Sequence, residues 1–441
     1  MGSFNVGLTG LNAATADLNV TGSNIANAET IGFKKSRAEF ADVFAQAYCY
    51  INRTATGSGV RLAATPQQFS QGSLQYTDNG LDMAINGQGF FVLNGGDGQV
   101  YSRSGEFQVN RDGYVVNSQG QYLQVYTPKT AGVSDTDFNV GQMTNLQIPT
   151  GDSPPVTTTS VNSEINLVTN ATPPLDATGT ALLPFDASDS ATYNYSSSVT
   201  VYDSLGAPHS MTMYFVQDIN TATTPASAQP LTWQVYTAMD GTQASGPTAM
   251  TFNVDGTINT PTTLDVTLTP TPPATSPFPN GGAIGTYDAT TATYDNTVTI
   301  DFSGMTEYGT SYSVGDMSQD GYAAGQLTGV DVDDNGVVFT RYSNGRSIAL
   351  GQVALANFKN PQGLQVLGDN SWGETYGSGA AVFDAPGAGE LGTIQAGALE
   401  MSNVDLTEEL VHLIQAQRYF QANSQTISTA DQMTQTILNL K

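Results

Sequence analysis

Apolar residues recur with a helical period at both ends of this 441-residue chain, whereas the region between the ends alternates with the period of a β-strand. A helix with a narrow apolar seam needs a partner surface to fold. The pattern therefore predicts a multidomain, mainly β fold with α-helical termini. We expect nested, discontinuous domains, the outermost being a coiled-coil-like domain built from both ends of the chain.

The expected domain boundaries follow the changes in period and composition. They give a helical domain and its linker at 1–70 plus 396–441, a β-rich middle domain at 71–145 plus 320–395, and an acidic outer β domain at 146–319.

The apolar residues of the terminal segments are spaced as in a heptad repeat. The N-terminal seam consists of Leu8, Leu11, Leu18 and Ile25 and predicts a helix over about Ser3–Asn27. The C-terminal seam consists of Leu406, Leu413, Phe420, Ile427 and Ile437 and predicts a helix over about Asp405–Leu440. Asp405, followed three residues later by Glu408, indicates a capping box at the start of the second helix.

Both terminal helices are expected to be weak in isolation. Gly7, Gly10 and Gly22 lie inside the first one, and each costs about 1 kcal/mol relative to Ala. The C-terminal helix is rich in uncharged Gln opposite its seam, where a solvent-exposed helix would carry charges. This composition suits an assembly or the lining of a water-filled channel, and an ordinary helical hairpin within one subunit is the alternative.

Basic residues are confined to the two ends of the chain. Residues 131–340 carry 21 acidic residues and no Lys or Arg, and so hold most of the formal net charge of −26. A long acidic stretch rich in Thr, Ser and Gly resists adhesion to anionic surfaces. We therefore expect an extracellular, solvent-facing β region, with compositional drift inside a soluble domain as the alternative.

The composition excludes several classes of protein. The scarcity of basic residues excludes a nucleic-acid-binding surface, and a single cysteine, Cys49, excludes an intrachain disulfide. With two histidines, no zinc site and no cofactor are expected. We find no phosphate loop, nucleophile elbow or paired-carboxylate motif, so no enzyme activity and no catalytic residue are expected.

Targeting signals are equally sparse. No apolar run is long enough to cross a membrane, so no membrane insertion is expected. The segment Met1–Gly10 lacks the features of a Sec signal peptide. An extracellular protein with this sequence would therefore need another export route.

Turn residues between alternating apolar residues predict several hairpins in the middle of the chain. The expected turns lie at Arg111–Gly113, Asp203–Gly206 and Asp255–Gly256, and a further strand is expected at Val298–Phe302. Two Thr- and Pro-rich stretches are predicted to be loops, Thr221–Pro230 and Thr260–Gly282.

The run Asp331–Gly336 resembles the first half of a calcium-binding loop. Its twelfth position, which should supply a bidentate Glu, is Tyr342, and strand-like residues flank it on both sides. We therefore interpret it as an Asn-Gly hairpin turn, and no metal site is expected.

Several motifs near the two ends resemble those of bacterial flagellar rod and hook proteins. They are Gly10–Ala14, Gly22–Asn27, Gly32–Lys34, Asp82–Phe91, Tyr101–Phe107, Gly397–Leu406 and Gln415–Tyr419. The motif residues that we single out are Asn24, Asn27, Gly32, Phe33, Asn403 and Asp405.

The middle of the chain resembles the hook-type members of this family. The resemblance lies in Val199–Gly206, Tyr342–Gly345 and Leu355–Phe358, whereas rod-type members are shorter and lack a large inserted β domain. It implies a structural subunit that polymerises into a curved hollow tube and acts as a universal joint, transmitting torque from motor and rod to the filament. The terminal helices would then pack subunits around an inner tube, with the acidic domain outside.

The resemblance also implies partners and a location. The partners would be further copies of the chain, the rod, hook cap and hook–filament junction proteins, and the type III export apparatus, with no nucleic acid. The location would be the extracellular bacterial flagellum, at its hook and basal body. Two alternatives remain: a distal rod subunit, which would form a straight and stiff tube, and a secreted acidic β-rich adhesin, which has no need of two heptad helices.

Overall fold

The chain forms two compact units in the computed structural model, which describes residues 2–43, 57–96, 98–129, 137–177, 179, 181–218, 232–269 and 276–439. Unit 1 comprises Met1–Thr150, Thr328–Arg341 and Ser347–Lys441, and unit 2 comprises Gly151–Leu327 and Tyr342–Arg346. Cys49 and the Thr221–Pro230 loop lie outside the described residues. The division into three domains stays a prediction.

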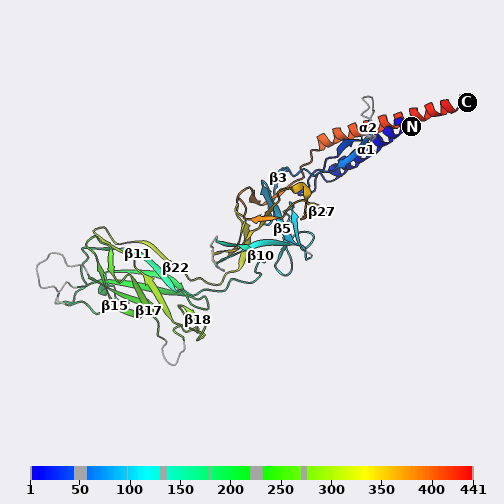
Figure 1. Cartoon of the computed structure of the whole chain (residues 1–441). Helices are drawn as coiled ribbons and strands as arrows, with labels where there is room; N and C mark the ends of the chain where they lie inside the picture. The colour runs from blue at the N-terminus through cyan, green and yellow to red at the C-terminus, as the bar shows by residue number, and fades with distance from the viewer. Residues whose placement is uncertain are drawn as a thin grey trace. The chain divides into compact units, whose positions relative to one another are not determined.

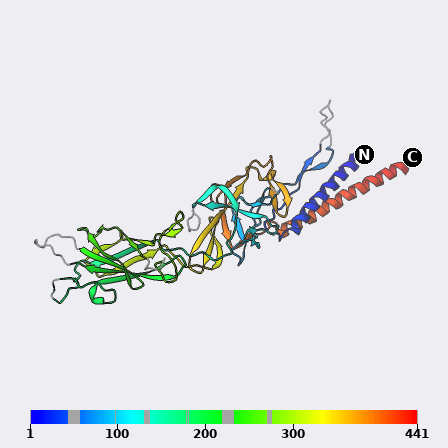
Figure 2. The ribbon, with the colours of Figure 1, turned by 90° about the horizontal axis from the view of Figure 1, so that it is seen from below.

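Two helices of unit 1, α1 (Gly2–Ala26) and α2 (Leu406–Asn439), run antiparallel and side by side, with the two termini at the same end of the pair (Figures 1 and 2). Both helices predicted from the heptad patterns are confirmed to within one residue at each end. Among the described residues, no helix combines the length and hydropathy needed to cross a membrane.

The start of α2 is capped by Asp405, whose carboxylate accepts the N–H groups of Thr407 and Glu408 at 2.8 and 3.2 Å. The other half of the predicted capping box is wrong. The Glu408 carboxylate lies 3.1 Å from Lys35 Nζ, because a nearby ammonium is a stronger partner than the backbone N–H of Asp405.

Small residues allow α1 and α2 to approach closely. A Cβ added at Gly7 would lie 2.9 Å from Ile427 Cγ1, and one added at Gly10 would lie 2.6 Å from Asn423 Oδ1. Ala416 is fully buried on α2. Two of the glycines that weaken α1 by propensity therefore make room for α2, whereas a Cβ at Gly22 would meet nothing within 4 Å.

Unit 1 is built on a 13-stranded sheet with the central order β23-β24-β25-β9-β5-β6-β28-β27. Its strands are β5 (Phe90–Asn94), β6 (Gln99–Ser102), β7 (Gln108–Val109), β8 (Val115–Val116), β9 (Tyr122–Pro128), β10 (Phe138–Asn145), β23 (Leu327–Val332), β24 (Val337–Tyr342), β25 (Ser347–Val353), β26 (Leu355–Asn357), β27 (Gln365–Gly368), β28 (Ser371–Gly373) and β29 (Val382–Asp384). Phe90, Tyr126 and Trp372 lie in its core. The predicted hairpin at Arg111–Gly113 is confirmed, because β7 pairs with β8.

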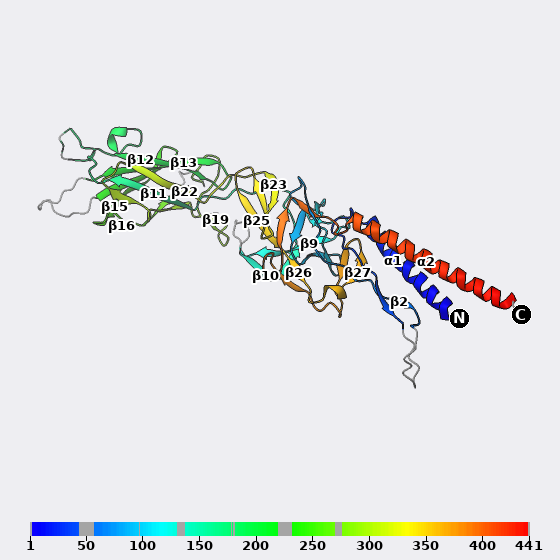
Figure 3. The same ribbon diagram turned by 90° about the horizontal axis from the view of Figure 1, so that it is seen from above.

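Three two-stranded pairs complete unit 1. They join β1 (Glu39–Asp42) to β2 (Val60–Ala64), β3 (Leu74–Tyr76) to β31 (Ala398–Glu400), and β4 (Met83–Asn86) to β30 (Thr393–Ala396). The β1–β2 pair lies along α1 (Figure 3), where the Val60 N–H donates to Thr9 Oγ1 at 3.4 Å. The pairs β3–β31 and β4–β30 join N-terminal to C-terminal segments, so unit 1 depends on both ends of the chain.

Residues Asp331–Gly336 form a turn between β23 and β24. Asp333 Oδ1 accepts the N–H of Val337 at 2.7 Å, and Asp331 pairs with Arg341 on the neighbouring strand. The interpretation of this run as a hairpin turn is thus confirmed.

Unit 2 packs two five-stranded sheets around one core. The first sheet contains β11 (Ser160–Val168), β17 (Thr263–Thr267), β20 (Thr297–Asp301), β21 (Thr306–Tyr308) and β22 (Ser313–Gln319). The second sheet contains β12 (Tyr195–Tyr202), β13 (Pro208–Gln217), β14 (Thr232–Met239), β15 (Thr242–Phe252) and β16 (Ile258–Thr260). A separate pair joins β18 (Tyr287–Asp288) to β19 (Thr293–Tyr294). Met213, Phe215, Trp233 and Phe302 are fully buried between the sheets. The hairpins β12–β13 and β15–β16 and the strand at β20 confirm the prediction.

The predicted loop Thr260–Gly282 is partly wrong. Its residues 263–267 form β17, which pairs with β20 along its whole length. Val266 is buried in the core of unit 2, and Phe278 further along is also buried. The Thr and Pro content masked a short alternation of apolar residues that fits a strand.

A buried carboxylate in unit 2 makes stability depend on pH. Burial raises the pKa of Glu307 above its usual range, and the hydrogen bond from Trp233 Nε1 at 3.0 Å opposes the rise. Because the folded chain holds this proton more tightly than the unfolded chain, the contribution of Glu307 to stability falls as the pH rises through the folded-state pKa.

We expect Glu307→Gln to stabilise unit 2 at neutral pH, because the amide keeps an acceptor for Trp233 and carries no charge. The gain should vanish below the pKa of the unfolded carboxyl, where Glu307 is protonated in both states. Urea unfolding followed by Trp233 fluorescence, in a Trp372→Phe background, measures this at pH 4 and pH 7. An equal effect of the substitution at both pH values would contradict the prediction.

Candidate functional site

The segments that follow α1 and precede α2 converge on the β-sheets of unit 1. We call this place the junction and define it by Asn24, Lys34, Arg103, Glu400 and Asn403. These residues come from both ends of the chain and from the segment after β6, and they fix the helix pair to the sheets.

Glu400, the last residue of β31, is the centre of the junction. Its fully buried carboxylate accepts hydrogen bonds from Lys34 Nζ at 2.6 Å, from Arg103 Nη1 at 3.1 Å and from the N–H of Gly72 at 2.9 Å. One anion thus neutralises two cations that are themselves almost completely buried. Such a cluster is costly to break, because removal of one partner leaves charge in a medium of low dielectric constant.

The two cations of the junction use further acceptors. Lys34 Nζ donates to the carbonyl of Ser70 at 2.8 Å, and Arg103 Nη2 donates to the carbonyl of Gly87 at 2.8 Å. Burial lowers the pKa of Lys34, and the Glu400 carboxylate opposes this. Burial likewise lowers the pKa of Arg103, again opposed by Glu400. The carboxylate is therefore what keeps these buried groups charged.

Asn24, at the end of α1, is buried and binds the chain as it turns back. Its Nδ2 donates to the carbonyl of Ser36 at 2.8 Å, and its Oδ1 accepts the N–H of Ser36 at 3.0 Å. Nδ2 also lies 3.3 Å from Glu409 Oε2 on α2. One amide therefore joins α1, the returning segment and α2, which explains why an Asn is needed at this motif position.

Asn403, just before α2, also joins several segments through its side-chain amide. Its Oδ1 accepts the N–H of Lys35 at 2.8 Å, while Nδ2 donates to the carbonyls of Gln68 and Ser70 at 2.8 and 3.2 Å. Three segments far apart in sequence are thus held by a single side chain.

The remaining motif residues shape the turn after α1. Gly32 has φ +70°, and a Cβ there would lie 2.6 Å from the backbone nitrogen of Ser104, so only glycine fits. Its N–H donates to the carbonyl of Glu400 at 2.7 Å. Asn27 makes only local bonds, with Nδ2 donating to the carbonyl of Ser23 at 2.9 Å, and Phe33 is half-buried.

The structure places the heptad residues along the helix pair with different exposures. Leu11, Leu18, Ile25, Leu413 and Ile427 are half-buried, whereas Leu8, Leu406 and Phe420 are exposed. The side chain of Ile437 lies outside the described residues. The assignment of these residues to packing between subunits stays a prediction.

The sequence motifs contain Lys34, Arg103 and Glu400, but no role was predicted for these three residues. In a chain with 12% charged residues, the presence of charged residues inside these motifs was the available signal. Their pairing could not be seen, because Lys34 and Glu400 are 366 positions apart.

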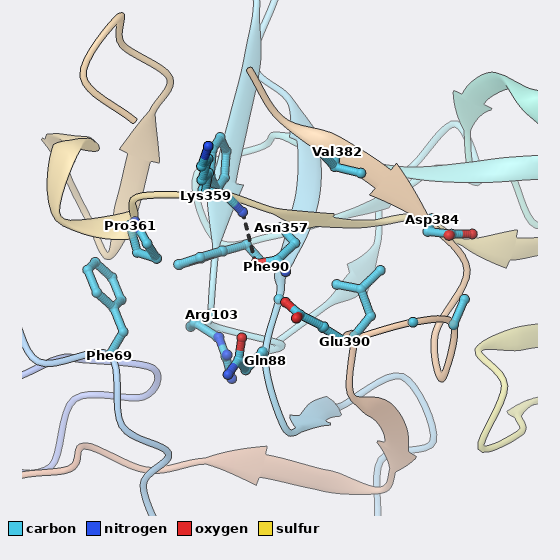
Figure 4. A pocket seen from close by; sticks show the side chains of 15 residues that line it. Phe69, Gln88, Phe90, Arg103, Asn357, Lys359, Pro361, Val382, Asp384 and Glu390 are labelled. Carbon is cyan, nitrogen blue, oxygen red and sulfur yellow. Dashed lines mark hydrogen bonds between the residues drawn. The ribbon is translucent and has the colours of Figure 1, made fainter. Parts of the chain in front are cut away.

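A pocket of about 740 Å³ opens beside the junction, with Arg103 in its wall (Figure 4). Phe69, Phe90 and Phe358 supply aromatic lining, and the Arg103 guanidinium lies 5.5 Å from the Phe90 ring centroid. Within the described residues, no group of three or more His, Cys, Asp and Glu side chains is placed to hold a metal ion.

Comparisons with known families agree along the chain. Four family profiles match: the flagella basal body rod protein at 4–34, the flagellar hook protein FlgE/F/G D1 domain at 84–169, the flagellar basal body protein FlaE D2 domain at 166–322, and the flagellar basal body rod FlgEFG protein C-terminal at 395–440.

Individual relatives match over the full length. The flagellar hook protein FlgE of Escherichia coli (strain K12) is 38% identical over 447 residues, and that of Borreliella burgdorferi is 31% identical over 474 residues, with all of each chain covered. A crystal structure of Helicobacter pylori flagellar hook protein FlgE2 aligns with a TM-score of 0.54 and 16% identity, over 74% of this chain and 100% of that one, and so shares the fold. The chain belongs to the flagellar hook protein family.

Proposed function

We propose that this chain is the subunit of a helical polymer, the flagellar hook, and that the α1–α2 pair forms the contacts between subunits. The observation that carries the proposal is an uncovered apolar face on α2. Leu406, Leu410 and Ile414 recur every four residues and are 46%, 49% and 50% exposed. Residues at this spacing share one helix face, and a lone subunit buries none of them.

The N-terminal helix supports the same proposal. Phe4, Val6 and Leu8 on α1 are 46%, 43% and 42% exposed. Contacts between different surfaces of identical subunits produce a helical array when the rotation does not close into a ring. The exposed heptad residues Leu8, Leu406 and Phe420 are therefore proposed to pack between neighbouring copies in the inner tube.

The junction gives the polymer a mechanical connection. Because Glu400, Asn24 and Asn403 join the helix pair to the sheets of unit 1, force on the helices would pass into these sheets through buried hydrogen bonds. We propose that the polymer acts as a universal joint, in which the contacts between neighbouring subunits change while unit 1 and unit 2 of each subunit keep their shape. The acidic unit 2 is proposed to face solvent.

The proposal includes partners and a place. Rod, hook cap and hook–filament junction proteins would contact the two ends of the polymer, and the flagellar type III apparatus would export the subunit to the cell exterior. No enzyme activity is part of it.

Electron microscopy of the purified chain at high salt tests the proposal. Salt screens the repulsion between subunits of net charge −26, so polymers are expected as the ionic strength rises. Curved hollow tubes are the expected result. Straight, stiff tubes would favour a rod subunit, and a monomer that persists and binds a glycan would overturn the proposal in favour of an adhesin.

A further inference from the structure

A histidine between two aspartates lies in unit 2, outside the helix pair and the junction. His209 is on β13, and its side chain is 11% exposed. Its Nδ1 lies 2.7 Å from Asp240 Oδ2, and its Nε2 lies 3.4 Å from Asp203 Oδ2. The Phe278 ring stacks on the imidazole, with centroids 3.7 Å apart and planes at 18°.

Each ring nitrogen faces a carboxylate oxygen, so the ring can donate to both aspartates only when both nitrogens carry a proton. A carboxylate can only accept, and a neutral imidazole has one N–H and one lone pair. When the second proton leaves, one of the two carboxylates faces a lone pair and loses its hydrogen bond. Both forms of the ring stack on Phe278, and the imidazolium gains an additional cation–π attraction from the face of that ring.

His209 joins three segments of unit 2. Asp203 belongs to the β12–β13 turn, where its Oδ1 accepts the N–H groups of Leu205 and Ala207 at 2.9 and 2.8 Å. Asp240 belongs to the β14–β15 turn, and its Oδ1 accepts the N–H of Ser210 at 2.9 Å. Phe278 lies in residues 276–284, which the contact of Asn280 Nδ2 with Asp203 also holds.

The Asp240 turn depends on side-chain hydrogen bonds of Asp240. Asp240 has φ +50°, a left-handed conformation that costs free energy for a residue with a side chain. Its side-chain bonds to Ser210 and His209 offset this cost. Loss of the bond to His209 would therefore weaken this turn.

Basic side chains are scarce in unit 2. Its ranges contain 16 acidic residues, and the other basic side chain in them is Arg346, which lies over the Tyr322 ring at 3.7 Å. Among the described residues, Asp203 and Asp240 are the charged groups in contact with the imidazole. Histidine is also the residue type that changes charge near neutral pH.

We propose that His209 is a pH-dependent clasp. As the imidazolium it holds the β12–β13 turn, the β14–β15 turn and residues 276–284 together, and when it loses its second proton the Asp240 turn and residues 276–284 open. The clasp concerns unit 2 alone, so it stands whether or not the helix pair polymerises.

Hydrogen–deuterium exchange of the full-length chain tests the clasp, with rates corrected for the intrinsic effect of pH. Between about pH 5.5 and about pH 8.5, protection of residues 238–243 and 276–284 is expected to fall about tenfold in the wild type. In His209→Gln it should be low and independent of pH. The other histidine provides the control, because His412→Gln on α2 should keep the wild-type profile.

A second variant separates loss of the clasp from a general failure to fold. Asp240→Asn keeps the acceptor for Ser210 and tolerates a left-handed backbone, but it removes one of the two carboxylates. Residues 238–243 should then exchange quickly at every pH, while the central part of β14, residues 233–237, stays protected. Wild-type protection that does not change with pH, or an unchanged pH slope in His209→Gln or Asp240→Asn, would overturn the proposal.

Discussion

Replacing Glu400 by Gln is expected to destabilise unit 1 by about 3–5 kcal/mol, the cost of leaving a buried charge without its partner. The amide has nearly the same shape and keeps one acceptor, so the loss reports the charge and not the packing. Lys34 and Arg103 would remain buried, at side-chain exposures of 0% and 4%, with no anion between them. The Gly72 N–H would keep a weaker acceptor.

The tryptophans allow this to be measured one unit at a time. The chain has two, Trp372 in the core of unit 1 and Trp233 in the core of unit 2. In a Trp233→Phe background, urea unfolding followed by fluorescence reports unit 1 alone. The free energy of unfolding is then compared with and without Glu400→Gln.

The matched control is Glu408→Gln, which removes the same charge from a surface ion pair. Glu408 is 54% exposed and lies 3.1 Å from Lys35 Nζ, so its loss should cost about 1 kcal/mol or less. Similar losses for both variants would show that Glu400 contributes no more than a surface pair, and the junction would lose its energetic basis.

Local patterns in the sequence predicted the elements but not their long-range contacts. Heptad spacing located α1 and α2, and turn residues located the hairpins β7–β8, β12–β13 and β15–β16, because both signals act between near neighbours. Strand β17 was missed because its apolar alternation is short and lies among Thr and Pro. The junction joins residues more than 300 positions apart, and one sequence holds no signal for such a pairing.

The glycines of α1 also show that local sequence signals do not reveal long-range contacts. Propensity correctly marks Gly7, Gly10 and Gly22 as costs to an isolated helix. Propensity does not say which of them faces a partner: Gly7 and Gly10 face α2, and Gly22 faces open space. The difference depends on the antiparallel register of the two helices, which the spacing of one helix cannot supply.

Replacing Ile414 by Asp is expected to abolish polymerisation while the monomer stays folded. Ile414 is 50% exposed on the uncovered face of α2, so a carboxylate there is solvated in the lone subunit. In the proposed polymer the same position is covered by a neighbouring copy, and burying an unpaired carboxylate costs several kcal/mol for every subunit added. Sedimentation of polymer at high salt should show a yield lower by at least about tenfold.

Two comparisons make the result decisive. Ile414→Leu keeps an apolar side chain of the same volume and should polymerise like the wild type. In a Trp233→Phe background, the unfolding transition of monomeric Ile414→Asp, followed through Trp372, should match that of the chain with Ile414, because the substituted side chain is not part of the core. Normal tubes from Ile414→Asp would place the subunit contacts elsewhere and leave the apolar face of α2 without a role. If Ile414→Leu also failed to polymerise, the interface would depend on the exact shape of this side chain, and burial of apolar surface alone would not explain assembly.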